Sequence, residues 1–232
     1  MDPEGTRDAT TEPSGLPVRA LPDGSDVRKA TAADLAAVVE ATARAFYDDP
    51  VFSWAFPSDE RRLHQLERGF GLFASRVWFP EDTVYTTDRL IGGAFWMPPK
   101  TWHLSAFAQL RMLPAMGLIA GRDFPRVMRL LNAVEARHPH EPHWYLPVIG
   151  VSPEWQGRGF GTALMRPVLK RCDREGLPAY LEASSPRSRA LYERHGFAVV
   201  EEMRVKDSPP FWRMWREPRD RGTSDGSACG AW

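Results

Sequence analysis

Apolar and polar positions follow their most regular pattern in the C-terminal half of the chain. A nearly continuous apolar run at residues 144–151 (WYLPVIGV) predicts a strand that is buried on both faces. Residues 162–172 repeat apolar side chains at the spacing of an amphipathic helix. A short apolar run at 179–183 (AYLEA), a helical turn with Tyr192 and a closing strand from Phe197 follow. This order predicts a unit of strand, loop, helix and strand.

Shorter patterns predict the elements of the N-terminal half. Residues 27–30 read as a strand, and Thr31 and Asp34 as a capping box for a helix that reaches Phe46. The aromatic and acidic segment 47–57 breaks that helix at Pro50. The remaining predicted elements are a helix from Ser58 to about Val77, an antiparallel strand pair at 83–87 and 91–97 with a turn at Asp88-Arg89, helices at 103–118 and 124–136, and last strands at 197–205 and 211–215.

Three glycines stand at alternate positions between the apolar run and the helix that follows it: Gly157, Gly159 and Gly161. Glycine lets the backbone approach a bulky anion. The free N–H groups at a helix start point at that anion, with the positive end of the helix dipole behind them. The loop therefore predicts a ligand that carries a phosphate or pyrophosphate.

Two familiar phosphate-binding loops fit this stretch poorly. A Walker A loop needs a Gly-Lys-Ser/Thr triplet, which the sequence lacks. The dinucleotide fingerprint needs glycine where Thr162 stands. Glu182 does lie about twenty residues past the loop, where that fold places a ribose-binding acid, but too little chain follows for the remaining βαβ units.

The stretch resembles the acetyl-CoA-binding motif of the GNAT superfamily of N-acetyltransferases. That motif is a hydrophobic strand ending in Val, then x-Pro, then Gln/Arg-x-x-Gly-x-Gly/Ala. The segments LEASSPR (181–187) and LYERHGF (191–197) also match, continuously from about residue 141, and AFYDDPVF (45–52) matches in part. The likeness is greatest to the puromycin N-acetyltransferases. The motif positions here are Val151, Pro153, Gln156, Gly159 and Gly161.

This resemblance implies an α/β (α+β) GNAT fold, in which helices flank a mixed, mostly antiparallel sheet of six to seven strands. The family sheet splays between its fourth and fifth strands, which accounts for Pro147 inside a strand, where it removes a ladder donor. The two helices at 103–118 and 124–136 lie between the third and fourth strands. Either they form a cap that shapes an acceptor pocket, or they only shield the sheet.

Length and composition restrict the setting. The 232 residues suit one domain, and 30 basic residues balance 30 acidic ones, so no overall field favours nucleic acid or a membrane surface. Polar tails at 1–25 and 218–232 are expected to be disordered, with the domain at 26–217. Cys172 and Cys229 have no partner at metal or disulfide spacing, and neither a signal peptide nor a spanning segment is evident. We expect a cytoplasmic monomer or homodimer that acts on a small molecule.

The resemblance also assigns the residues that hold acetyl-CoA. The backbone from Gln156 to Thr162 would cradle the pyrophosphate, and the backbone of Ile149 and Val151 would pair with the pantetheine arm. Ser188 stands where many relatives have an Asn that contacts CoA, and its shorter side chain puts that contact in question. The expected cofactor-binding residues are Ile149, Val151, Gln156, Gly157, Arg158, Gly159, Phe160, Gly161, Thr162 and Ser188.

Two residues are candidates for proton transfer. Tyr192 matches the family tyrosine that protonates the CoA sulfur, and a phenol with a pKa of about 10 suits that leaving group. Alternatively, it is a core aromatic residue of an amphipathic helix. Glu182 is a carboxylate within an otherwise apolar strand, where burial raises a pKa. It is either a general base or ammonium anchor, or a member of a structural ion pair.

Aromatic and acidic residues suggest an acceptor site for a cationic, partly hydrophobic amine. Asp49 and Trp54 lie in the segment that lines the acceptor site in GNAT folds, Trp96 could extend the aromatic wall, and Tyr145 lies on the strand beside Glu182. Plain packing is the alternative for each aromatic residue. The segment HPHEPH (138–143) invites a zinc hypothesis, but its spacing fits no usual zinc pair, so we expect a linker and no metal.

The sequence thus predicts an acetyl-CoA-dependent N-acetyltransferase in which a small-molecule amine, such as an aminonucleoside antibiotic, attacks the thioester directly. A protein lysine or N-terminal acetyltransferase would keep the same cofactor site. A non-catalytic acyl-CoA-binding module is the third possibility, because fold and cofactor motif do not determine the acceptor.

Overall fold

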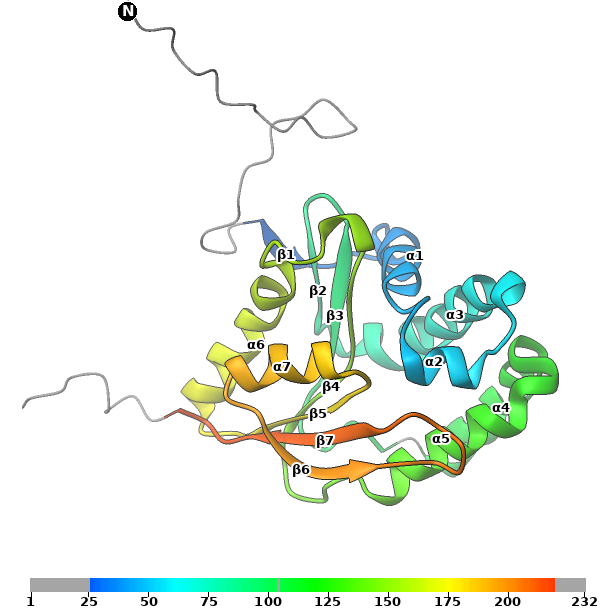
Figure 1. The fold of residues 1–232 in the computed structure, drawn as a ribbon. Coiled ribbons are helices and arrows are strands. Elements are labelled where there is room, and N and C mark those ends of the chain that lie inside the picture. The colour runs from blue at the N-terminus through cyan, green and yellow to red at the C-terminus, as the bar shows by residue number, and fades with distance from the viewer. Residues whose placement is uncertain (1–25, 104, 220–232) are drawn as a thin grey trace, which may run out of the picture.

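The computed structural model of the chain describes residues 26–103 and 105–219. Within them, seven strands form one sheet in the order β1-β2-β3-β4-β5-β7-β6 (Figure 1), and β4–β5 is its single parallel pair. This confirms the predicted mixed, mostly antiparallel sheet. The strands are β1 (Val27–Lys29), β2 (Val84–Thr87), β3 (Gly92–Met97), β4 (Trp144–Val151), β5 (Ala179–Ala183), β6 (Ala198–Met203) and β7 (Phe211–Arg216).

Helices cover both faces of the sheet. Neighbouring residues of β3 belong to different cores, because side chains alternate along a strand: Trp96 packs with α6 (Phe160–Glu175), and Phe95 packs with α1 (Leu35–Ala45) and α3 (Asp59–Phe73). The other helices are α2 (Pro50–Ala55), α4 (Ala106–Ala120), α5 (Phe124–Ala136) and α7 (Pro186–Arg194), with a π-helical turn at Ala74–Trp78 and 3-10 turns at Phe79–Glu81, Gly121–Asp123 and Pro153–Trp155.

The sheet splays between β4 and β5, as expected. Their ladder pairs only Trp144–Leu146 with Ala179–Leu181, and Pro147 follows at once. Because proline has no N–H to donate, the ladder cannot continue through it. Beyond this point β4 pairs with β3 alone. An edge of backbone therefore faces the gap between the two halves of the sheet.

Close backbone contact brings α1 onto the splayed strand. A Cβ atom added to Gly150 would lie 3.0 Å from Cγ2 of Thr42 and 3.1 Å from Cβ of Ala45. At Gly93 the nearest atom would be Cγ1 of Val38, at 2.6 Å. The lack of side chains on β3 and β4 at these positions therefore permits the tight contact with α1.

Three local predictions need correction. Pro50 does not simply break a helix but begins α2, because proline is well suited to the first helical position and Asp49 caps the turn. Gly161 lies within α6, which starts at Phe160, so the loop itself contains only Gly157 and Gly159 of the three glycines. The helix expected from Ser58 to about Val77 changes to a π-helical turn after Phe73.

The predicted tails fall largely outside the described residues. Residues 1–25 lie outside them altogether, and so does Cys229. Of the segment 218–232, Pro218 and Arg219 are described, and the backbone N–H of Arg219 donates to Asp173 at 2.8 Å. None of the helices in the described ranges has both the length and the apolar character needed to cross a bilayer.

Candidate active site

A cavity of about 1060 Å³ opens at the splay. Its walls come from β4, the glycine loop, β5, α7 and the side of the molecule that carries α2, α4 and α5. Most of the expected site residues meet there: Asp49, Tyr145, Ile149, Val151, Gln156, Gly157, Gly159, Phe160, Gly161, Thr162, Glu182, Ser188 and Tyr192.

The glycine loop has the conformation of an anion cradle. Gly157 and Gly159 have φ of 79° and 88°, in the left-handed region that favours glycine, and no atom lies within 4 Å of an added Cβ at either position. Gly159 caps α6, whose first N–H groups have no partner within the helix. The Gln156 side chain donates to the Val151 carbonyl at 2.9 Å and so ties the loop to the end of β4.

The start of α7 also lines the cavity. Ser185 and Ser188 form a capping box in which each hydroxyl oxygen accepts from the other residue's N–H, at 3.1 and 3.2 Å. The Ser188 hydroxyl is therefore already used in the helix cap, although the residue lines the cavity. Arg187 and Arg194 of α7 also line the cavity and add positive charge near the loop. These groups fit a phosphate-bearing ligand such as CoA.

Tyr192 lies on the cavity wall contributed by α7 and is buried. Burial raises the pKa of its phenol above the ordinary value, and the nearby carboxylates of Asp49 and Glu182 raise it further. The phenol is therefore fully protonated at neutral pH. It has a proton to give, and it is a weaker acid than a free tyrosine, mainly because it is buried.

Glu182 is the buried carboxyl group of the cavity. Its Oε2 accepts a hydrogen bond from the Tyr145 hydroxyl at 2.9 Å, while Oε1 has no protein partner in the described part of the chain. Burial raises the pKa of Glu182 to about 7, against the opposing effect of the Tyr180 and Tyr145 hydroxyls and the charge of Arg213. A carboxyl group with a pKa near neutrality in the wall of the cavity suits a general base.

Asp49 is the second buried carboxyl group. Oδ1 accepts from the N–H groups of Val51 and Phe52 at 3.0 and 3.2 Å, and Oδ2 accepts from the hydroxyl of Ser184. Burial raises the pKa of Asp49 to about 6, against the effect of these hydrogen bonds. Both oxygens already have donors, so Asp49 is held in place, whereas Glu182 keeps an oxygen free.

Three expected site residues lie outside the cavity. Arg158 is exposed, with its guanidinium 5.0 Å from the centroid of the Trp155 ring. Trp96 is fully buried in the core beneath α6. Trp54 lines a separate groove on the outer side of α2. Neither tryptophan therefore contributes to the wall of the cavity.

The sequence interpretation missed part of the site. Ser184 is the main polar addition, because its bond to Asp49 joins the end of β5 to the start of α2; its place in LEASSPR gave no sign of this contact. The cap helices α4 and α5 line the cavity, which agrees with the first of the two interpretations given for them. Their apolar lining residues are Met116, Ile119, Ala120, Val127, Leu130, Leu131 and Val134.

Two histidines of the segment 138–143, His138 and His143, and the described cysteine, Cys172, are buried and make packing contacts. His138 stacks on Trp102 with ring centroids 3.8 Å apart, and its Nε2 lies 3.1 Å from Nε2 of His143. Among the described residues no group of three metal-ligating side chains occurs. Cys172 is buried, and burial raises the pKa of its thiol to about 12, so it does not supply a thiolate nucleophile.

The chain belongs to the acetyltransferase (GNAT) family, whose model matches residues 39–197. Members of this family are acyltransferases that use acetyl-CoA as cosubstrate, and the phosphate cradle described above fits that cosubstrate.

Three proteins illustrate how close its relatives are. An uncharacterized N-acetyltransferase of Schizosaccharomyces pombe is 28% identical over 197 residues, covering 79% of this chain and 80% of that protein. A crystal structure described as histone acetyltransferase HPA2 and related acetyltransferase from Corynebacterium glutamicum is 27% identical, with a TM-score of 0.62 over 83% of this chain and 96% of that one. A polyamine N-acetyltransferase of Drosophila melanogaster shares the fold at 18% identity, with a TM-score of 0.56 over 82% of this chain and 98% of that one.

Proposed function

We propose that the protein is an acetyl-CoA-dependent N-acetyltransferase that acetylates the primary amine of a small molecule. The observation that carries this proposal is the presence of Glu182, Asp49 and Tyr192 around one cavity beside the phosphate cradle. A carboxylate with a free oxygen, a second anchored carboxylate and a protonated phenol supply the groups that amine acylation requires.

The chemistry proceeds by direct attack. The amine nitrogen forms a bond to the thioester carbonyl carbon while the bond from that carbon to sulfur breaks. The ammonium form of the amine loses two protons in becoming the amide. Glu182 takes one, directly or through water, Tyr192 gives its own proton to the departing thiolate, and the second proton from nitrogen restores the phenol. Asp49 contributes negative charge that favours entry of a cationic amine. The loop from Gln156 to Thr162 would hold the pyrophosphate, and the unpaired edge of β4 at Ile149 and Val151 the pantetheine arm.

The apolar lining on one side of the cavity supports a small acceptor. Residues of α4 and α5 line it together with α2, and apolar side chains dominate that part of the wall. The sequence likeness to puromycin N-acetyltransferases points to an aminonucleoside antibiotic or another amino-acid-like amine. We propose a reducing, cytoplasmic setting on the grounds given for the sequence.

The test is thiol release from acetyl-CoA with a panel of amines, puromycin included. We expect amine-dependent release whose specificity constant differs by orders of magnitude across the panel. Tight CoA binding without transfer to any amine of a broad panel would contradict the proposal and favour a non-catalytic acyl-CoA-binding module.

A protein acetyltransferase is the second candidate function. It is favoured by the likeness to the Corynebacterium glutamicum structure, which is described as a histone acetyltransferase. Incubation with radiolabelled acetyl-CoA and either proteins or the small-molecule fraction of a cell extract separates the two. Label in protein lysines or N-termini alone would favour this second function.

A further inference from the structure

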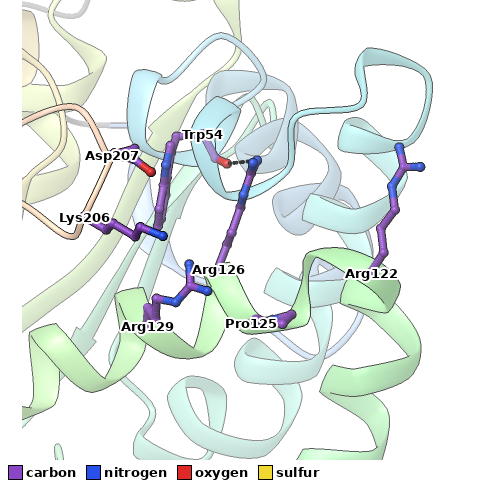
Figure 2. Close-up of a pocket in the computed structure, with 7 residues that line it drawn as sticks. All are labelled: Trp54, Arg122, Pro125, Arg126, Arg129, Lys206 and Asp207. Carbon is purple, nitrogen blue, oxygen red and sulfur yellow. Dashed lines mark hydrogen bonds between the residues drawn. The ribbon is translucent and has the colours of Figure 1, made fainter.

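A second concave surface lies on the outer side of α2 and α5, next to the turn between β6 and β7. This basic groove has a volume of about 410 Å³ (Figure 2) and lies at the small end of the range for ligand pockets. It brings four cations together with one carboxylate in a chain whose total charges balance. Its lining residues are Trp54, Arg122, Pro125, Arg126, Arg129, Lys206 and Asp207.

Among the described residues, the cations of the basic groove form no ion pair with a carboxylate, unlike several arginines elsewhere in the fold. Arg126 donates to the carbonyl oxygen of Trp54 at 3.1 Å, which orients it without neutralising it. Within the described ranges no carboxylate pairs with Arg129 or Lys206, whereas Arg213 and Arg216 both form ion pairs. Clustered cations in a concave surface create a local positive potential that attracts anions.

The backbone at Lys206 adds an independent observation. Lys206 has φ of 45°, a left-handed conformation that favours glycine. The turn is held by the Ser208 hydroxyl, which accepts from the Val205 N–H, and by the Ser208 N–H, which donates to the Val205 carbonyl, both at 2.8 Å. A lysine in this place is strained relative to glycine.

Figure 2 shows how the side chains are arranged. Arg126, Arg129 and Lys206 gather around Trp54, while Arg122 extends away from them. Their guanidinium and ammonium groups are donors that bind oxyanions through charge-assisted hydrogen bonds. We propose that the basic groove binds an oxyanion, a carboxylate or phosphate group, through Arg126, Arg129 and Lys206.

The basic groove adjoins the acceptor side of the cavity. Arg126 and Arg129 alternate along α5 with Val127 and Leu130, which line the cavity, and Trp54 packs in one cluster with Val51 and Leu130. The oxyanion is therefore either the anionic end of the acceptor amine or a free anion bound beside it. The first source rests on the proposed function, and the second does not.

Calorimetric titration with inorganic phosphate tests the site itself. Saturating CoA keeps the glycine loop occupied, so that phosphate cannot report on the loop. We expect one saturable site per chain, with affinity reduced at least about tenfold in the Arg129→Ala/Lys206→Gly double variant. Both side chains are exposed, and glycine relieves the strained turn, so this variant should keep its thermal stability.

The matched control is Arg76→Ala/Lys170→Ala, which removes two exposed cations that line neither the groove nor the cavity. It should bind phosphate like the wild type. Kinetics with pairs of amines that differ only by a carboxylate or phosphate then identify the source. A KM raised about tenfold in the groove variant for the anionic amine alone indicates the acceptor, and unchanged kinetics with lost phosphate binding indicates a free anion.

Equal phosphate binding and equal KM values in the wild type and the groove variant would overturn the inference. Failure of the proposed function looks different. In that case no amine, charged or neutral, supports turnover, while the phosphate titration still decides whether the groove binds an oxyanion.

Discussion

At the scale of single residues, the cavity holds three titratable groups whose charges affect one another. Asp49 and Glu182 both have raised pKa values because they are buried, and both carboxylates in turn raise the pKa of Tyr192. Glu182 keeps a free oxygen, whereas both oxygens of Asp49 accept hydrogen bonds. This difference is the reason for which we propose Glu182 as the base and Asp49 as the anchoring charge.

Replacing Glu182 by Gln should remove a pH dependence as well as activity. The base form of Glu182 predominates above its pKa of about 7, so kcat/KM of the wild type should rise through that pH. The variant should lose about 10²–10⁴-fold in kcat/KM and retain only the pH dependence of the amine. Glu40→Gln, on the exposed side of α1, should behave like the wild type. If Glu182→Gln showed the same dependence of kcat/KM on pH as the wild type, Glu182 would not be the base.

Replacing Glu182 by Gln should also change how the free energy of unfolding depends on pH: the variant should gain stability relative to the wild type as the pH rises. The pKa of Glu182 is higher in the folded chain than in the unfolded chain, so the group favours folding below the unfolded pKa of about 4.5 and loses that contribution as pH rises through about 7. Gln carries no such charge. We compare the unfolding free energy of Glu182→Gln with that of the wild type at each pH. This difference should shift in favour of the variant by about 2 kcal/mol between pH 5 and pH 8. Thermal melts at both pH values would measure it, and a difference independent of pH would contradict the assigned burial.

Tyr192→Phe should lower kcat by about 10²-fold or more and leave the affinity for CoA nearly unchanged, because only the proton donor is lost. Thiol release measures kcat, and calorimetry measures CoA binding. Tyr85→Phe, on β2 and outside the cavity, is the matched control. If Tyr192→Phe retained full kcat, Tyr192 would be a wall residue rather than the acid.

At the scale of elements, the glycine loop joins β4 to α6 in a conformation that only some of its glycines need. Gly157 and Gly159 have positive φ, whereas Gly161 lies inside the helix, where an added Cβ would be 3.4 Å from Cδ2 of Leu191. The first two positions therefore shape the loop, whereas neither the backbone conformation nor the contact at the third position requires glycine.

Gly159→Ala separates conformational strain from ligand binding. Alanine in the left-handed region costs about 1–2 kcal/mol of stability. At Gly159 the distortion should also raise the KM for acetyl-CoA about tenfold or more, because the N–H groups of the cradle lose their alignment. Gly176→Ala imposes the same strain at the C-terminal end of α6, where φ is 65°, and should leave that KM unchanged. Equal KM values in the two variants would contradict the role of the cradle.

At the scale of the whole molecule, the splay converts one sheet into two halves with a cavity between them. Contacts that join the halves include three ladder pairs from Trp144–Leu146 to Ala179–Leu181, the hydrogen bond from Tyr145 to Glu182 and one shared core cluster, and Ser184 at the end of β5 also bonds to Asp49. Helix α1 supports the free part of β4 through the close contact at Gly150. The position of the reactive groups thus depends on packing between distant segments.

Gly150→Ala should test that packing. The added methyl group would lie 3.0–3.2 Å from atoms of Thr42 and Ala45, so α1 must move away from β4, at a cost of about 1–3 kcal/mol. Chemical denaturation measures this cost. Gly69→Ala, in the middle of α3 with no atom within 4 Å, should be neutral or stabilising. A neutral Gly150→Ala would show that the contact is not tight.

The elements that the sequence predicted well are those defined by local rules. The strand pair β2 and β3 with its short turn, the apolar run of β4 and the helical spacing of α5 and α6 follow from contacts near in sequence, and the structure confirms them. Pro147 marked the splay because a missing N–H interrupts a ladder in any context. The local prediction was wrong at Pro50, where capping by Asp49 allowed a new helix.

The sequence by itself determined the family, the cofactor loop and two candidate groups for proton transfer, because these depend on short motifs and backbone chemistry. Only the tertiary structure decided which side chains face the cavity. Trp54 and Trp96 looked equivalent to Tyr145 in the sequence, but topology turns Trp54 to an outer groove and Trp96 into the core. Asp49 and Ser184 meet across 135 residues. Neither contact nor burial over such separations follows from local pattern, because the fold brings these segments together through packing of the whole chain.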